Sequence, residues 1–516
     1  MWIAPATHIR DIDRRATEEF GIPAKVLMER AGLAVFKSVR EILPTGGHIC
    51  VFAGKGNNGG DGFVVARLAY ENRYGVDCLV AGSEADLRPQ ARDQMLAMRA
   101  TGLEPIFFED PRWMARADCV GCRDLVVDAL LGTGAASEVT GAVKTAIQSI
   151  NRAGVPVLSV DVPSGVQCDT GEELGESVWA LRTVTFGMPK PFLFQGIGIE
   201  HSGFWTVAEI GYPSALLNTP TEAKLIDTEW VGNLLPERLR ASNKGDNGHV
   251  LIIAGSDTMA GAAVLAARAA IRAGAGLVTV ASTPRVCMMV NVSLPEALTL
   301  PLPETEGVID LRAAEALLAQ QGRCDSALFG PGLSHSRPVC DLLERVWRDW
   351  TIPTVIDADA LNAVSEGLAL PAADCVLTPH PGEMSRLLKN SVAEIQADRF
   401  RTVAKAAEQF GKTVLLKGPY SLIAERNEPM LVNSTGNPGM ASGGMGDTLA
   451  GITATLLGQE LPGYYSMACA AFWHGFAADL CASEIGAIGY TATDVSNMLP
   501  SARVKIGESC EQRPSC

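Results

Sequence analysis

Short apolar runs recur along both halves of the chain and alternate with stretches of helical period. The runs are rich in Val, Ile and Leu, and nearly all end in Gly, Asp or another polar residue. Such runs are typical of strands buried on both faces of a parallel sheet, so we predict an α/β fold in each half. The predicted strands are 49–53, 125–127, 157–160 and 184–186, then 250–254, 277–281, 327–329, 354–356, 375–377 and 414–416.

The length of the chain predicts two domains, because 516 residues exceed the roughly 250–300 residues at which single cores stop growing. Segment 211–240 has no strong period and contains three prolines. We therefore place the boundary near residue 220, which gives domains 1–220 and 221–516. The apolar stretch 262–281 carries two arginines and two glycines, and it predicts a core helix leading into a strand rather than a membrane span.

The net charge and the cysteines indicate which partners and which compartment to expect. The net charge is −15 and no run of Lys or Arg appears, which argues against binding to nucleic acids or anionic membranes. Thirteen scattered cysteines, often inside apolar runs, indicate reduced thiols, and no secretory signal is apparent, so we expect a cytoplasmic protein. Cys119 and Cys122 have Cys-x-x-Cys spacing, but no second cysteine pair completes a zinc site, and the role of the two residues stays open.

The first predicted strand is followed by a loop with five glycines in nine residues, 54–62, and then by a predicted helix at 63–70. We expect the glycines to permit backbone conformations that are closed to other residues. The N-terminus of the helix would then bind an anion. The alternative is a tight strand–helix turn, which needs fewer glycines.

Two further strand ends carry carboxylates. Asp128 is followed by the Gly132-Thr133-Gly134 loop, and Asp161 is followed by Ser164. Each carboxylate alone is as typical of a cap or turn. The carboxyl ends of parallel strands meet at one edge, however, and carboxylate, amide and hydroxyl oxygens together suit a hard cation.

These three motifs, with the segment 27–32, resemble the NAD(P)H-hydrate epimerase family, whose domain is a Rossmann-like three-layer α/β/α sandwich. Arg30 stands where that family often has Asn. The resemblance implies a potassium ion held by Asn58, Asp128 and Ser164. It also implies contacts with the hydrated nucleotide from Asn57, Asn58, Gly59, Gly60, Asp61, Gly132, Thr133, Gly134 and Asp161.

Epimerisation of a hemiaminal carbon requires its hydroxyl to leave and return, or the ring to open and close. Both routes need an acid/base group beside a cation. We favour Asp161 as the acid/base. Lys190 matches a lysine of the family and is a second catalytic candidate, while a solvated surface lysine is an equal alternative.

The strongest signal in the second half is segment 437–451, where a loop of small residues runs into a helix with Asp447 in its first turn. Backbone amides at such a helix start stabilise charge on a transferring phosphoryl group. Asp447 is placed to take a proton from an attacking hydroxyl. The alternative is a helix cap after a flexible loop.

This segment resembles the ribokinase-like superfamily, an α/β/α fold. Further strand-end motifs narrow the resemblance to the NAD(P)H-hydrate dehydratases over about 224–504, and they lie at 243–246, 254–256, 330–333, 357–362, 377–383 and 417–421. The implied nucleotide contacts are Lys417, Gly418, Pro419, Tyr420, Ser421 and Gly446. The implied contacts with the hydrated cofactor are Ala262, Gly332, His380 and Asp447.

Three of these residues keep a second interpretation. A histidine such as His380 is by itself more often structural, but its position between two prolines at a strand end favours a ligand role. Asp357 and Asp359 are candidates to support Mg²⁺, directly or through water, or to form a turn or cap.

The resemblance implies repair of hydrated NADH and NADPH. Asp447 would deprotonate the hydrate hydroxyl for attack on the terminal phosphate of ADP, and loss of the phosphate ester would restore the reduced cofactor. Fusion of both domains favours ADP, with ATP and the preferred hydrate left open. Relatives assemble, so a homo-oligomer is expected. The alternative is a vitamin-precursor kinase joined to a non-catalytic scaffold domain.

Overall fold

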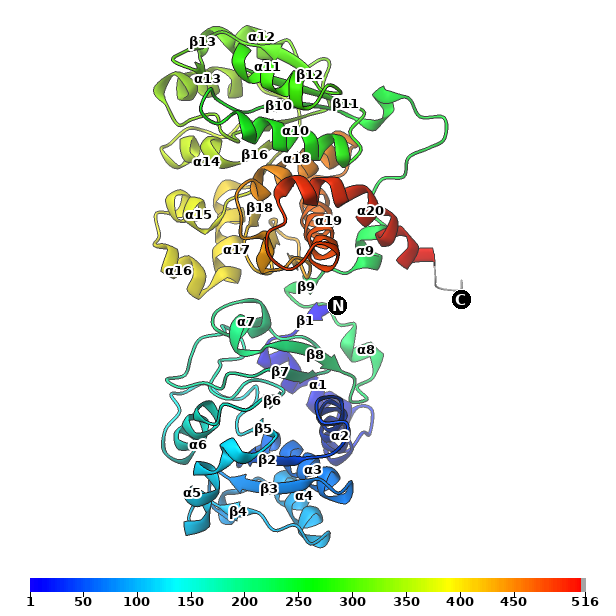
Figure 1. Ribbon diagram of the computed structural model, residues 1–516, viewed down its shortest axis with the longest axis vertical. Coiled ribbons are helices and arrows are strands. Elements are labelled where there is room, and N and C mark those ends of the chain that lie inside the picture. Colours follow the sequence, from blue (N-terminus) through cyan, green and yellow to red (C-terminus); the bar gives the residue numbers. More distant parts are fainter. Residues whose placement is uncertain (512–516) are drawn as a thin grey trace. The chain divides into compact units, whose positions relative to one another are not determined.

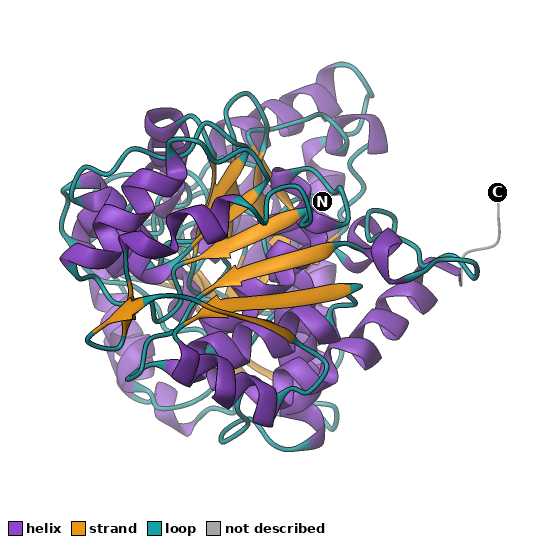
Figure 2. Cartoon of the chain, turned by 90° about the horizontal axis from the view of Figure 1, so that it is seen from above, coloured by secondary structure: helices purple, strands orange, loops and turns teal. Residues whose placement is uncertain are grey.

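The computed structural model describes residues 1–511, and the chain divides into two compact units, the first ending at Ala223 and the second beginning at Lys224 (Figure 1). We predicted the division near residue 220, in the proline-containing segment. Each unit is an α/β structure with helices packed around the strands of its sheet (Figure 2). None of the helices formed by residues 1–511 combines the length and the hydropathy that a membrane span requires.

The sheet of the first unit has seven strands in the order β4-β3-β2-β5-β6-β7-β8, and neighbouring strands are parallel. These strands are β2 (His48–Ala53), β3 (Gly75–Val80), β4 (Ile106–Phe107), β5 (Leu125–Ala129), β6 (Val157–Val160), β7 (Arg182–Phe186) and β8 (Phe204–Ala208). The first strand of the chain, β1 (Trp2–Ile3), is not one of the seven. The helices are α1 (Ala6–Glu18), α2 (Ala24–Ile42), α3 (Asn57–Glu71), α4 (Pro89–Ala100), α5 (Pro111–Asp118), α6 (Gly141–Arg152), α7 (Gly198–His201) and α8 (Ser214–Leu217), with 3₁₀ segments η1 (Glu84–Asp86), η2 (Val120–Cys122) and η3 (Pro191–Phe194).

Successive residues of β2 belong to two different cores. Val51 packs with α2, α3 and α4 on one face, whereas Phe52 packs with Trp113 of α5 and Ile147 of α6 on the other. This alternation follows from the two-residue period of a strand. It confirms the predicted three-layer arrangement, with helices on both faces of the sheet.

The glycine-rich segment 54–62 differs from our prediction. Helix α3 begins at Asn57, not at 63, so most of the segment is helix. None of its five glycines has a positive φ. Four of them are needed for space: a Cβ on Gly59 would lie 1.9 Å from the Gly54 carbonyl oxygen, and one on Gly54 would lie 1.8 Å from the Leu130 oxygen, whereas one on Gly56 would meet nothing within 4 Å. The expectation of unusual backbone conformations was wrong, and close backbone packing takes its place.

The sheet of the second unit runs in the order β20-β19-β18-β17-β16-β15-β10-β11-β12. Neighbours from β18 to β12 are parallel, and β19 and β20 add antiparallel strands at one end. The strands are β9 (Ala223–Leu225), β10 (His249–Ile253), β11 (Leu277–Ser282), β12 (Leu298–Pro301), β13 (Glu304–Thr305), β14 (Val308–Ile309), β15 (Ser326–Phe329), β16 (Thr354–Ile356), β17 (Cys375–Leu377), β18 (Thr413–Leu416), β19 (Leu422–Ala424) and β20 (Met430–Val432).

Its helices include a buried group, α10, α18, α19 and α20, that packs on one face of this sheet. Segment 262–281 forms the end of α10 and then β11, as predicted. The helices are α9 (Thr228–Gly232), α10 (Ala260–Arg272), α11 (Pro284–Ser293), α12 (Ala314–Leu318), α13 (Arg337–Trp347), α14 (Ala358–Ser365), α15 (Pro381–Leu388), α16 (Val392–Ala397), α17 (Arg399–Phe410), α18 (Met445–Gly458), α19 (Gly463–Glu484) and α20 (Ala492–Glu511), with 3₁₀ segments η4 (Lys244–Asn247), η5 (Leu311–Ala313) and η6 (Pro438–Met440).

Candidate active sites

A cavity of about 530 Å³ opens at the carboxyl ends of β2, β5 and β6 in the first unit. Most of the residues predicted to contact a nucleotide line it. These are Asn57, Asn58, Asp61, Gly132, Thr133, Gly134 and Asp161, and the catalytic candidate Lys190 lines the cavity as well. Gly59 and Gly60 do not line the cavity, because Gly59 packs on Gly54 and a Cβ on Gly60 would lie 2.6 Å from the Met28 sulfur.

Asp128 and Ser164 lie behind the cavity wall. The buried carboxylate of Asp128 accepts hydrogen bonds from the Ser164 hydroxyl (2.5 Å), the Ser164 amide (2.9 Å) and the Ser159 hydroxyl (2.9 Å). Burial raises the pKa of Asp128, and the bonds from Ser164 oppose that rise. The Ser164 oxygen in turn accepts from the Leu131 amide at 2.9 Å, and Asn58 donates to the Leu131 carbonyl at 2.8 Å. The three predicted cation ligands therefore meet around Leu131, and all can offer oxygen atoms.

Asp161 and Lys190 form a buried pair at the end of β6. Lys190 is 0% exposed and donates to Asp161 Oδ1 at 2.6 Å, to the Thr185 hydroxyl at 2.7 Å and to the Phe186 carbonyl at 2.9 Å. The Thr185 hydroxyl and the Phe186 amide also donate to Asp161 Oδ1. The alternative of a solvated surface lysine is therefore wrong. Asp161 has φ 67, a strained conformation that the surrounding bonds hold in place.

Two further groups in this cavity carried no motif in the sequence. Asp13 of α1 accepts a hydrogen bond from the Tyr212 hydroxyl at 2.5 Å, and both residues line the cavity. Burial raises the pKa of Asp13, and the nearby Asp161 charge adds to the rise. Burial also raises the pKa of Asp61 well above its usual value, with Asp161 and Asp13 contributing. The cavity thus combines one ion pair with two carboxyl groups whose pKa values are raised.

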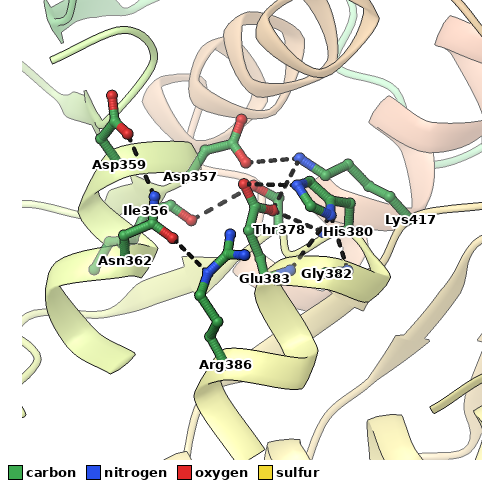
Figure 3. A network of polar contacts seen from close by, with 10 residues as sticks. All are labelled: Ile356, Asp357, Asp359, Asn362, Thr378, His380, Gly382, Glu383, Arg386 and Lys417. Carbon is green, nitrogen blue, oxygen red and sulfur yellow. Dashed lines mark hydrogen bonds and ion pairs between the residues drawn. The ribbon is translucent and has the colours of Figure 1, made fainter. Parts of the chain in front are cut away.

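In the second unit, Asp357, Glu383 and Lys417 converge from three strand ends (Figure 3). Lys417 Nζ donates to Asp357 Oδ1 at 2.7 Å and lies 3.8 Å from Glu383 Oε2. Burial alone would lower the pKa of Lys417, but the charges of these two carboxylates raise it. Burial raises the pKa of Glu383 to about 7, and the Lys417 charge limits the rise.

His380 caps helix α15. Its Nδ1 accepts from the amides of Gly382 (3.0 Å) and Glu383 (3.3 Å), and its own amide donates to Glu383 Oε2 at 2.8 Å (Figure 3). Partial burial, with the charges of Lys417 and Arg386, lowers the pKa of His380. The structural interpretation of this histidine therefore holds, and half of the side chain also remains exposed.

Asp447 lies in the first turn of α18. This helix begins at Met445, directly after Gly444, which has φ 88. Burial raises the pKa of Asp447 to about 7; the Asp357 charge adds to this and the Lys417 charge opposes it. A Cβ on Gly446 would lie 3.4 Å from Lys417 Nζ, so the start of α18 faces the Lys417–Asp357 pair. Asp447, which belongs to the strongest motif of the sequence, therefore lies at the same site as the Lys417–Asp357 pair.

Comparisons with known proteins cover both units. The family model described as "YjeF-related protein N-terminus" matches residues 24–192, and the one described as "NAD(P)H-hydrate dehydratase" matches residues 250–501. The bifunctional NAD(P)H-hydrate repair enzyme of Moorella thermoacetica is 38% identical over 520 residues, which span 99% of this chain and 98% of the relative. That of Coxiella burnetii is 39% identical over 499 residues, spanning 96% and 98%.

The chain belongs to the family of bifunctional NAD(P)H-hydrate repair enzymes. A solved ribokinase-like superfamily protein of Enterococcus faecalis is also similar, with a TM-score of 0.50 and 26% identity, over 56% of this chain and 97% of that one. The ribokinase-like fold predicted for the second half of this NAD(P)H-hydrate repair family member is therefore confirmed.

Three further residues predicted for the second site of this NAD(P)H-hydrate repair family member are Ala262, Gly332 and Asp359. A Cβ on Gly332 would lie 3.0 Å from the Ala262 Cβ, so these two residues are adjacent. Asp359 accepts from the Ser334 amide at 2.9 Å, a bond between distant segments, and from Asn362 at 3.3 Å, a bond within α14. Residues 1–511 contain no group of three His, Cys, Asp or Glu side chains arranged to hold a metal ion.

Proposed function

We propose that this protein repairs hydrated NADH and NADPH. The first unit interconverts the two hydrate epimers, and the second dehydrates the S epimer with ADP, giving AMP and phosphate. The observation that carries the proposal is the position of Asp447, at the N-terminus of α18 and beside the Lys417–Asp357 pair. The full-length similarity to repair enzymes favours this function over the vitamin-precursor kinase.

In the first unit, we assign proton exchange with the hydrate to Asp161. Its Oδ1 takes the hydrogen bonds from Lys190, Thr185 and Phe186, so Oδ2 is the oxygen that faces the reacting hydroxyl. Lys190 holds Asp161 in place through its hydrogen bond, which is a positioning role. Asn57, Asn58, Asp61 and 132–134 hold the nucleotide.

Asn58, Asp128 and Ser164 would hold a potassium ion, and their shared contact with the Leu131 segment fits an all-oxygen site. When bound, the ion supplies positive charge beside the phosphates of the hydrated cofactor.

In the second unit, Asp447 removes the proton of the hydrate hydroxyl, whose oxygen forms a bond to the β-phosphorus of ADP while the bond to AMP breaks. The ring nitrogen lone pair then expels phosphate, and a proton leaves the adjacent ring carbon. Free amides at the start of α18 stabilise the charge on the phosphoryl group. Lys417, Gly418, Pro419, Tyr420, Ser421 and Gly446 hold the nucleotide, and Ala262, Gly332 and His380 hold the hydrate. Asp357 and Asp359 would support Mg²⁺ through water, which would screen the phosphate charge.

The test is to add the protein to a mixture of both hydrate epimers with ADP or ATP and to follow the absorbance of the reduced cofactor. Full recovery is expected with ADP. Recovery of a single epimer would contradict the epimerase assignment, and a stable phosphorylated product would favour the kinase. Parallel runs with hydrated NADH and hydrated NADPH establish the preferred substrate.

We further propose a cytoplasmic homo-oligomer with no nucleic-acid or membrane partner. The net charge of −15 disfavours binding to polyanions, and most of the free cysteines of residues 1–511 are buried thiols, which suits a reducing compartment. Light scattering on the purified protein measures the assembly, and a monomer would overturn that part of the proposal.

A further inference from the structure

Arg399 lies beneath the 417–421 loop, which joins β18 to β19. It is the first residue of α17, a helix that packs on both strands, and it is 1% exposed. One guanidinium nitrogen, Nη1, donates to the Pro419 carbonyl. Above it, Gly418 and Pro419 are exposed to solvent.

This buried cation has no protein counter-charge within residues 1–511. Its Nε and Nη2 atoms make no hydrogen bond there, and no carboxylate of that part of the chain forms an ion pair with it. Burial lowers the pKa of Arg399 to about 10, so the side chain stays protonated at neutral pH. An unpaired buried charge is costly, and its cost is relieved when an anion binds nearby.

The only layer between Arg399 and the loop surface is backbone. Gly418 has φ +140, a conformation that favours glycine, and a Cβ there would lie 3.0 Å from Arg399 Nη2. The missing side chain leaves the loop surface close to the guanidinium. A charge separated from a ligand by a thin layer that excludes water acts strongly on that ligand.

The lysine of the same loop is already engaged. Lys417 Nζ turns to Asp357 at 2.7 Å and to Glu383 at 3.8 Å, so these carboxylates balance its charge. The negative charge of a polyphosphate on the loop therefore needs a cation other than Lys417 to balance it. Arg399 lies beneath Gly418 and Pro419 and can supply that charge.

We propose that Arg399 is a positioning residue that supplies the counter-charge for the phosphates of the nucleotide on the 417–421 loop. The inference rests on the proposed function in one respect, namely that a nucleotide binds this loop. Arg399 holds Pro419 through Nη1, and its remaining positive charge attracts the phosphates through the backbone of Gly418.

The experiment compares Arg399→Met, Arg399→Gln and Arg399→Lys in the full-length protein, with Arg401→Gln as the matched control because Arg401 is an exposed arginine of the same helix. Calorimetry measures the binding of ADP and of adenosine, which lacks phosphate. Met and Gln should weaken ADP binding about tenfold and leave adenosine binding within about twofold. Arg399→Lys should recover most of the loss, and Arg401→Gln should bind like the wild type.

Two further measurements separate this role from a structural one. In the repair assay, KM for ADP should rise in Arg399→Gln while kcat and epimer exchange stay near wild type. Without ligand, Arg399→Met should melt no lower than the wild type, because it removes an unpaired buried charge, yet the same concentration of ADP should raise its melting temperature less than that of the wild type. Should Arg399→Met fail to fold, Arg399→Gln, which keeps a polar side chain without the charge, gives the same comparison.

Equal losses of ADP and adenosine binding would overturn the proposal, as would unchanged ADP binding in Arg399→Gln. If the wild type binds ADP and repairs hydrates but the variants match it, only this inference fails. If the wild type binds no nucleotide, the proposed use of ADP fails as well.

Discussion

Each unit places a buried lysine among carboxyl groups at strand ends, but the two lysines have different neighbours. Lys190 has three acceptors within 2.9 Å, and only one of them, Asp161, is a carboxylate. Lys417 lies between Asp357 and Glu383, with Asp447 close enough to raise its pKa further. Burial raises the pKa of Glu383 and of Asp447 to about 7, and the Lys417 charge only partly opposes that rise. Burial also raises the pKa of Asp13 and of Asp61 in the first unit, but there Lys190 is hydrogen-bonded to a single carboxylate, Asp161. The two sites therefore differ in how many carboxylates pair with the lysine, one in the first unit and two in the second.

The glycines of the two sites also differ. Those after β2 have no positive φ, and all but Gly56 are required for close packing. Those of the second site, such as Gly332, Gly418 and Gly444, have positive φ and shape turns.

The largest expected effect separates the two lysine sites by function. Asp447→Asn should lower the rate of cofactor recovery by about 10²–10⁴-fold, because it removes the general base, while epimer exchange continues. Asp161→Asn should instead slow epimer exchange, while recovery of the cofactor from the S epimer continues. Recovery and epimer exchange are measured on the same preparations, and loss of both activities in either variant would contradict the separation of roles.

Removal of Lys190 should be the most destabilising change at either lysine. Lys190→Met leaves Asp161 buried without its cation and should lower the free energy of unfolding of the first unit by about 3–5 kcal/mol. Lys417→Met should cost less, because Glu383 and Asp447 can stay protonated near neutral pH. Denaturant unfolding of both variants provides the comparison, and equal losses would count against it.

A smaller effect tests the two kinds of glycine. Gly59→Ala should lower the free energy of unfolding by about 1–3 kcal/mol or more, since its Cβ would lie 1.9 Å from the Gly54 oxygen. Gly443→Ala is the matched control: a Cβ there meets nothing within 4 Å, and the expected change is within about 0.5 kcal/mol. Calorimetry of the full chain measures both, and a neutral Gly59→Ala would refute the packing explanation.

The pH dependence should show the smallest effect. Because Asp447 acts ionised and has a pKa of about 7, recovery should slow as the pH falls below about 7. The folded-state pKa values of Asp447 and Glu383 lie above their ordinary values of 3.8 and 4.5, so their contribution to stability is complete below about 4 and is lost as the pH rises through about 7. Glu383→Gln should flatten the stability profile across this range in chemical unfolding at several pH values. A profile as steep as that of the wild type would exclude the proton-sharing cluster.

The predicted strands are those with continuous apolar runs, and all of them are present. The other strands were not predicted. Among them, β3 has Asp77 at its centre and β8 is a partly exposed edge strand, so neither forms a continuous run of buried aliphatic residues. The short strands β19 and β20 are buried apolar runs and were missed all the same. Motifs identified the strand-end residues, because glycine and acidic residues after a strand leave a local pattern. Asp13, Tyr212 and Arg399 leave none: each acquires its role from a segment distant in the sequence, and only tertiary packing brings the partners together.

The cap formed by His380 has a consequence for recognition. With Nδ1 occupied as an acceptor from two backbone amides, the neutral ring carries its hydrogen on Nε2. The Nε2 edge, which lies 3.4 Å from Glu383 Oε1, can therefore only donate. Whatever atom of a bound molecule meets that edge must be an oxygen or nitrogen with a lone pair, so a carboxamide would have to turn its carbonyl, and not its amino group, toward the imidazole.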